Sequence, residues 1–261
     1  MAAPPTTNVV LVLFVVLAYV AQAVTDSDGQ LLAVHAAVVT AAFIVVVRDP
    51  NRPLGAPTLP ERWRRHAPAL TSRPWLEAIA VTGAAVFVIS CAQAIGALAE
   101  LIWPVGDEPL YNDAVLTGNN LGIDLASIYT AAIGEELLFR LALLVVIANW
   151  LGPRTAIVIT AGVWALAHTG FDNGYPAAIV VGLVAAGLAA AAITLATRSV
   201  WPAIVAHALH NLSSVLRDHE VPGDWVVGIV YGLAGGAFAL SGCSMVSHWR
   251  ENRRPQATPV S

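Results

Sequence analysis

The sequence contains no lysine, and charged residues make up only 11% of its 261 residues. Soluble domains have about 25% charged residues, so this shortage argues against an ordinary soluble protein. All thirteen basic residues are arginine, and the net charge is −4, so we expect no nucleic-acid partner. The two cysteines, Cys91 and Cys243, lie far apart in apolar runs and make no disulfide framework.

Long apolar runs are abundant instead, with 57% hydrophobic residues and a mean hydropathy of +0.70. A membrane-spanning helix needs about 20 mainly apolar residues, and such runs cover residues 8–24, 31–48, 76–102, 124–149, 155–171, 175–197, 200–217 and 225–247. Six tryptophans lie near the ends of runs, at the depth of the lipid headgroups: Trp75, Trp103, Trp150, Trp201, Trp225 and Trp249. The sequence predicts an all-α, polytopic transmembrane helical bundle of about eight spans.

The arginine-rich loop 48–74 sets the expected orientation. It holds six arginines, so the positive-inside rule places it in the cytoplasm, and eight spans then put both termini there. Because residues 1–8 carry no basic segment, we expect the first run to be a retained anchor. The expected location is a bacterial plasma membrane. We expect the whole chain to divide into three segments, with N-terminal spans over 1–123, a core over 124–216, and a last span with a basic tail over 217–261. Gly and Pro are expected to break helices at 152–153, 174–176, 201–202 and 222–223.

Charged residues within a span indicate function by default, and the run 134–140, GEELLFR, has three. Glu136 and Arg140 are four residues apart, so on an α-helix they share a face and can pair. Glu135 is rotated by about 100°, which leaves its carboxylate to face a cavity and to act as a general base. The alternative is a purely structural ion pair that holds helices together.

Two later helices carry further polar residues. Trp164 and His168 lie one helical turn apart in GVWALAHTG, and His207 and Asn211 lie one turn apart in AHALHN. His207 has the chemistry to bind a metal or to transfer a proton, and Asn211 to orient a histidine or to donate to an oxyanion. The alternative role for these residues is hydrogen bonding between helices, worth about 0.6 kcal/mol each in membranes.

Together the three clusters resemble the CPBP family of intramembrane proteases, which includes the type II CAAX prenyl endopeptidases and bacteriocin-processing or immunity proteins. The family pattern EExxxR, FxxxH and HxxxN corresponds here to Glu135-Glu136 with Arg140, to Trp164 with His168, and to His207 with Asn211. Trp164 replaces the usual Phe, which we expect to reshape the pocket wall and to leave the chemistry intact. The resemblance covers roughly residues 124–216.

The resemblance implies an endopeptidase that cleaves a membrane-associated peptide or protein. Glu135 would activate water, His168 and His207 would hold that water directly or through a divalent metal such as zinc, and Asn211 would stabilise the oxyanion. There is no HExxH zinc-protease motif in the sequence, so glutamate-activated water is favoured. One alternative is a non-proteolytic immunity or scaffold protein of the same fold. The other is an ion-coupled transporter, but transporters typically have internal repeats, and none is evident in this sequence.

Overall fold

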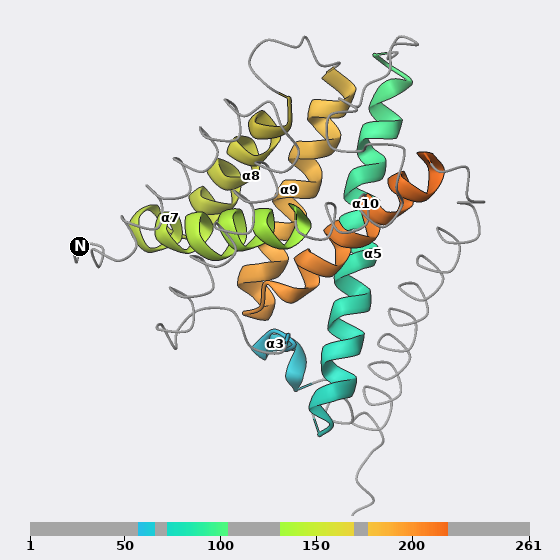
Figure 1. The fold of residues 1–261 in the computed structure, drawn as a ribbon. Helices are drawn as coiled ribbons and strands as arrows, with labels where there is room; N and C mark the ends of the chain where they lie inside the picture. The colour runs from blue at the N-terminus through green and yellow to red at the C-terminus, as the bar shows by residue number, and fades with distance from the viewer. Residues whose placement is uncertain (1–56, 66–71, 104–130, 170–176, 219–261) are drawn as a thin grey trace, which may run out of the picture.

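A computed structural model describes residues 57–65, 72–103, 131–169 and 177–218 (Figure 1). Within these ranges every regular element is a helix, which confirms the all-α class. The elements are α3 (Glu61–Arg64), α5 (Pro74–Glu100), η2 (Leu137–Leu143), α7 (Leu144–Leu151), α8 (Pro153–Thr169), α9 (Ala177–Thr197) and α10 (Trp201–Asp218).

Two of the described helices, α5 and α9, are long and apolar enough to cross a membrane. They correspond to the runs predicted over 76–102 and 175–197. The runs 8–24, 31–48 and 225–247 lie outside the described residues, as do both termini. The eight-span count, the segment boundaries and the cytoplasmic termini therefore stay predictions.

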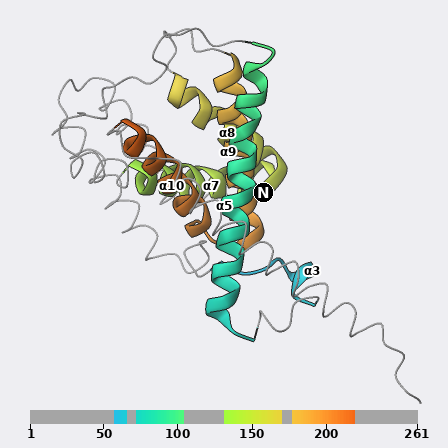
Figure 2. The same ribbon diagram turned by 90° about the vertical axis from the view of Figure 1, so that its right-hand side faces the viewer.

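The pair α5 and α9 forms the centre of the bundle, and the two helices run side by side in both views (Figures 1 and 2). Glycine makes this approach possible. A Cβ atom at Gly96 would come within 3.0 Å of the Gly182 Cα, and a Cβ at Gly182 would come equally close to the Gly96 Cα. Small residues of this kind let membrane helices pack backbone to backbone.

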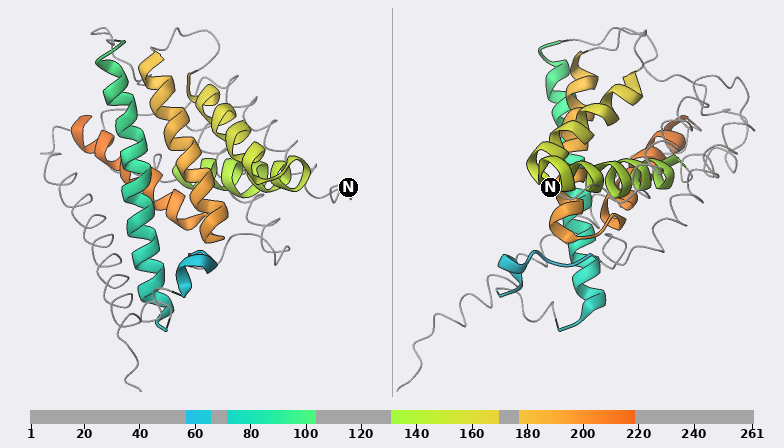
Figure 3. Two further views of the ribbon diagram at one scale, coloured as in Figure 1. Left: turned by 180° about the vertical axis from the view of Figure 1, so that it is seen from behind. Right: turned by 90° about the vertical axis from the view of Figure 1, so that its left-hand side faces the viewer.

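The remaining helices pack around this pair. Helix α8 lies against α9, where a Cβ at Gly187 would come within 3.1 Å of Ala161. Helix α10 crosses α5 through a cluster that includes Val86, Ile89 and Ala203. The helix formed by η2 and α7 lies across α8 and α9 (Figure 3). Three helices that carry the polar motifs, η2 with its preceding turn, α8 and α10, thus meet on one side of α9.

Two of the helix breaks predicted from Gly and Pro are confirmed. Helix α7 ends at Leu151, and Gly152 follows with a backbone φ of +84°. Residues other than glycine rarely adopt such a backbone conformation. Pro153 then begins α8, where its missing N–H is harmless. Pro202 lies in the first turn of α10 for the same reason. The breaks expected at 174–176 and 222–223 lie outside the described residues.

Part of the arginine-rich loop attaches to the ends of the central helices. The buried Glu77 carboxylate, in the first turn of α5, accepts a hydrogen bond from the Leu59 backbone N–H at 2.7 Å and lies 3.8 Å from Arg64. Thr58 donates its backbone N–H to the Thr197 carbonyl at the end of α9. Within this loop, residues Glu61–Arg64 form the short helix α3.

Candidate active site

The GEELLFR segment lies in a helix that changes its winding. Residues 131–136 are α-helical, Leu137–Leu143 form a π-helix, and α7 continues to Leu151. An α-helix was predicted for the whole segment, so the π-helical turns over Leu137–Leu143 correct that prediction. Residues 137–142 are all buried, and the local sequence carries no signal for this change of winding. π-helical turns are rare in proteins overall, and those that do occur often lie at functional sites.

The predicted ion pair between Glu136 and Arg140 is present. Arg140 Nε lies 3.3 Å from Glu136 Oε2, and both side chains are almost fully buried. The pair is a contact of charges rather than an aligned hydrogen bond, because among the described residues neither of these two atoms has a hydrogen-bond partner. The Arg140 guanidinium also lies 4.9 Å from the centre of the Trp164 ring, close enough for a cation–π attraction.

Glu136 has a second partner that the sequence analysis did not anticipate. Its Oε1 lies 3.1 Å from Nδ1 of His207, which is 71 residues further along the chain. An ionised carboxylate can only accept, so His207 donates from Nδ1, and in the neutral ring Nε2 is left unprotonated. Glu136 is therefore more than a brace for Arg140, since it also sets the orientation and the tautomer of His207.

The prediction that the Glu135 carboxylate is left free is wrong. Its Oε2 accepts a hydrogen bond from the Trp164 indole N–H at 3.1 Å and lies 3.2 Å from His168 Nε2. Its side chain is 15% exposed, against 2% for Glu136. The Glu135 side chain reaches another helix, α8. Its partners come from α8, which spacing within one helix has no means to reveal.

His168 is held by its own helix. Its Nδ1 lies 2.8 Å from the backbone carbonyl oxygen of Trp164, and a carbonyl can only accept, so Nδ1 carries a proton. In a neutral ring Nε2 would then be an acceptor facing the Glu135 carboxylate, which is also an acceptor. The short contact is attractive only if a proton or another cation lies between these two groups.

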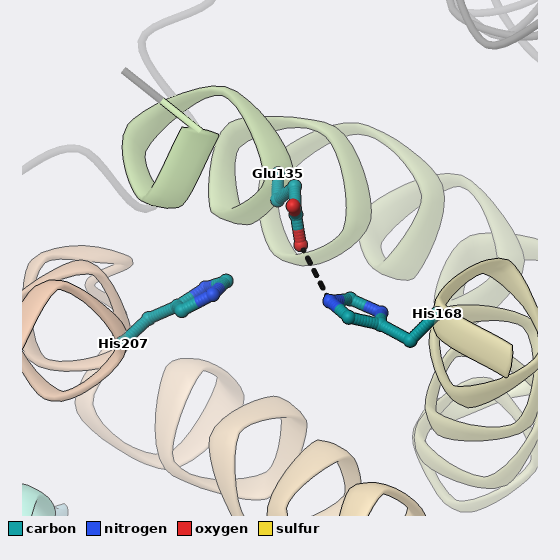
Figure 4. Close-up of side chains that lie close together, drawn as sticks. All are labelled: Glu135, His168 and His207. Carbon is teal, nitrogen blue, oxygen red and sulfur yellow. Dashed lines mark ion pairs between the residues drawn. The ribbon is translucent and has the colours of Figure 1, made fainter. Parts of the chain in front are cut away.

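Glu135, His168 and His207 converge from three helices (Figure 4). Each offers a ligand atom, and these atoms all lie within 4.8 Å of one another. A tetrahedral zinc site needs three such ligands and a water. Ligating histidines usually donate their other N–H to a carboxylate or a backbone carbonyl, as His207 and His168 do here. The donor set therefore fits a divalent metal, with Glu135 added to the two histidines that the sequence analysis proposed as ligands.

Asn211 lies on α10 one turn after His207 and is half-buried. Within the described residues no hydrogen bond joins its side chain to Glu135 or His168, so its predicted role stays a prediction. Trp164 was expected only to reshape the pocket wall. The indole N–H that Trp164 donates to Glu135 is the functional group that it missed, and a Trp in place of Phe, one turn before His168, was the available signal.

Residues 118–213 match the family model of the type II CAAX prenyl endopeptidase Rce1-like proteins. This segment contains all seven predicted site residues. The match confirms, over this part of the chain, the resemblance to the CPBP intramembrane proteases that the three motifs indicated. At the level of the family, it supports a membrane-embedded peptidase of the CAAX type. No curated protein matches the chain, and no solved structure does.

Proposed function

Because residues 118–213 match this endopeptidase family, we propose that the protein hydrolyses a peptide bond in a membrane-associated substrate with water activated by Glu135. One observation carries the proposal. A carboxylate and two imidazoles from three separate helices bring one ligand atom each to within 4.8 Å of one another. A purely structural ion pair needs a single carboxylate, and Glu136 already supplies one to Arg140, so pairing with Arg140 does not account for Glu135 and the two imidazoles.

Glu135 is assigned as the general base. One carboxylate oxygen, Oε2, is occupied by Trp164 and His168, so Oε1 is the oxygen available to a water molecule. The Glu135 carboxylate takes a proton from this water while the oxygen of the water bonds to the scissile carbonyl carbon. The same proton then passes to the nitrogen of the leaving amine as the C–N bond breaks. Atoms and charge balance without any other reactant.

His207 is assigned to position the water, because Glu136 holds its Nδ1 and leaves its Nε2 for this role. His168 is assigned to hold the Glu135 carboxylate, through a proton shared between the two groups. Asn211, one turn from His207, is assigned to donate to the oxyanion that forms on the carbonyl oxygen. Preorganised donors of this type are typically worth a factor of about 10²–10³ in kcat.

Glu135, His168 and His207 are also the residues that would hold a divalent metal. A metal bound there would supply Lewis-acid chemistry and lower the pKa of bound water. In that case Glu136 and the Trp164 carbonyl fix the two imidazoles for ligation. Metal content of the purified protein, measured by elemental analysis for the wild type and for His168→Ala, tests this part. Stoichiometric metal in the wild type that is lost in the variant supports ligation.

The substrate class is tested by comparing the termini of membrane proteins in cells that carry the wild type or Glu135→Ala. We expect new C-termini in the wild-type cells, at sites close to a lipid-modified cysteine, and the intact precursors in the variant cells. Glu100→Ala is the matched control, because Glu100 is an exposed glutamate at the end of α5. It should give the wild-type pattern.

The comparison also has an outcome that contradicts the proposal. If Glu135→Ala cells contain the same processed termini as wild-type cells, with equal amounts of protein in the membrane, this carboxylate activates no water. Processed termini that depend on Glu135 but lie far from any lipid-modified cysteine would keep the peptidase and reject the CAAX-type substrate.

A further inference from the structure

We propose that the indole N–H of Trp164 is a positioning group for the catalytic carboxylate: it pins Oε2 of Glu135 and thereby reserves Oε1 for water. The inference rests on the proposed function, because it assigns Trp164 a part in the same reaction. The group concerned is the indole N–H, which plays no part in ordinary aromatic packing.

Two polar contacts of the Glu135 carboxylate fall on one oxygen. Trp164 Nε1 donates to Glu135 Oε2 at 3.1 Å, and His168 Nε2 lies 3.2 Å from the same atom. No hydrogen bond to Oε1 is present among the described residues. A carboxylate without a fixed donor can rotate and exchange its oxygens, whereas the indole N–H, whose direction is fixed by α8, defines which oxygen faces the water.

Trp164 is held firmly enough to do this. Its side chain is 5% exposed and packs against Leu138, Phe139 and Ala186. The Arg140 guanidinium lies over its ring, and the His168 ring centre is 4.3 Å from its own. A Cβ atom at Gly187 would come within 3.2 Å of the indole Cε3, so the glycine on α9 leaves the space that the indole fills.

Trp164 also serves His168, because its backbone carbonyl accepts the Nδ1–H. One residue therefore contacts both members of the Glu135–His168 pair, one through its side chain and one through its backbone. A side-chain substitution leaves the backbone contact in place, and an isostere of the indole also keeps the ring contact with His168. The indole N–H can therefore be tested while the hydrogen bond to His168 Nδ1 stays unchanged.

The test replaces Trp164 by 3-benzothienylalanine, which keeps the size and shape of the indole and has sulfur in place of N–H. The isostere is incorporated at an amber codon into the full-length protein, and cleavage is measured in liposomes with a fluorogenic farnesylated CAAX peptide. Because a hydrogen bond to a charged group is lost, we expect kcat to fall about tenfold, with KM within twofold and a melting temperature lowered by several degrees. The isostere at Trp150, an exposed residue of α7, is the incorporation control and should behave as wild type.

Trp164→Phe is the second variant, and it decides the matter if the isostere destabilises the protein. It should also lose about tenfold in kcat, because it lacks the same donor. Wild-type kcat in either folded variant would overturn the inference. A rise in KM without a fall in kcat would overturn it too, since the indole would then bind substrate rather than position Glu135.

The two proposals fail in different ways. Glu135→Ala is measured in the same assay. If Glu135→Ala cleaves normally, the proposed function is wrong. If Glu135→Ala is inactive while the Trp164 isostere cleaves at the wild-type rate, the proposed function stands and the positioning role of the indole is rejected.

Discussion

The contact between α5 and α9 and the cluster between η2, α8 and α10 solve opposite problems. At Gly96 and Gly182 the helices meet because side chains are missing, and the backbones lie in direct contact. At Glu135, His168 and His207 the helices carry polar side chains into a largely apolar bundle. The first region contributes packing, while the second imposes a desolvation cost that stability alone does not explain. Substitutions in the two regions should therefore separate stability from activity.

The largest effect is expected at His168. His168→Ala removes one partner of Glu135 and a potential ligand, so cleavage should fall about 10³-fold, within the range for acid–base groups. The melting temperature should change little, because the His168 side chain is 29% exposed. A cleavage assay and a thermal melt in detergent check both statements. Near-normal cleavage would remove His168 from the site.

Glu136→Ala should affect stability most. It leaves the Arg140 guanidinium buried without its carboxylate, which costs about 3–5 kcal/mol for a broken buried pair. The His207 ring loses its partner as well, so the folded fraction should also cleave slowly. Denaturant unfolding of Glu136→Ala beside Glu135→Ala checks this contrast. Equal stability of the two variants would contradict the division of roles between these glutamates.

Gly182→Val tests the packing region. The new side chain would overlap the Gly96 backbone, and overpacking costs about 1–3 kcal/mol. The kcat of the molecules that remain folded should be unchanged, as measured by activity normalised to folded protein. Gly162→Ala on α8 is the matched control, because nothing lies within 4 Å of a Cβ there. It should stabilise the helix by about 0.5–1 kcal/mol. A larger loss of unfolding free energy for Gly162→Ala than for Gly182→Val would contradict this account.

The smallest effect is expected at Thr160 and Thr194. Their hydroxyl oxygens are buried and have no hydrogen-bond partner among the described residues. Replacing either residue by Val should change the unfolding free energy by less than about 1 kcal/mol, because no hydrogen bond is lost. Denaturant midpoints check this expectation. A loss above 2 kcal/mol, on the scale of a lost hydrogen bond to a charged group, would reveal a partner for that hydroxyl.

The sequence was sufficient for the helical class and for contacts within one helix. Apolar runs located α5 and α9, Gly152 and Pro153 located a break, and i,i+4 spacing located the pair of Glu136 with Arg140. Spacing of this kind depends on helix geometry alone. The π-helical turns over 137–143 were missed because the mostly apolar sequence there fits an ordinary α-helix equally well.

Contacts between distant helices were beyond reach from residue patterns. The motif resemblance brought Glu135, His168 and His207 into one expected site, but it assigned no contact from His207 to Glu136 or from Trp164 to Glu135. Both contacts depend on how helices cross, and on individual ring orientations. They changed two interpretations: Glu135 is a held carboxylate rather than a free one, and Glu136 serves His207 as well as Arg140.

The central claim is that Glu135 activates water, and Glu135→Gln tests it most directly. The amide keeps the size of the side chain and an oxygen that can accept the Trp164 N–H, and it removes the basic oxygen. In liposomes with the farnesylated peptide, the variant should retain the wild-type melting temperature within a few degrees and lose cleavage by at least about 10²-fold. Cleavage by Glu135→Gln at the wild-type rate would contradict the account.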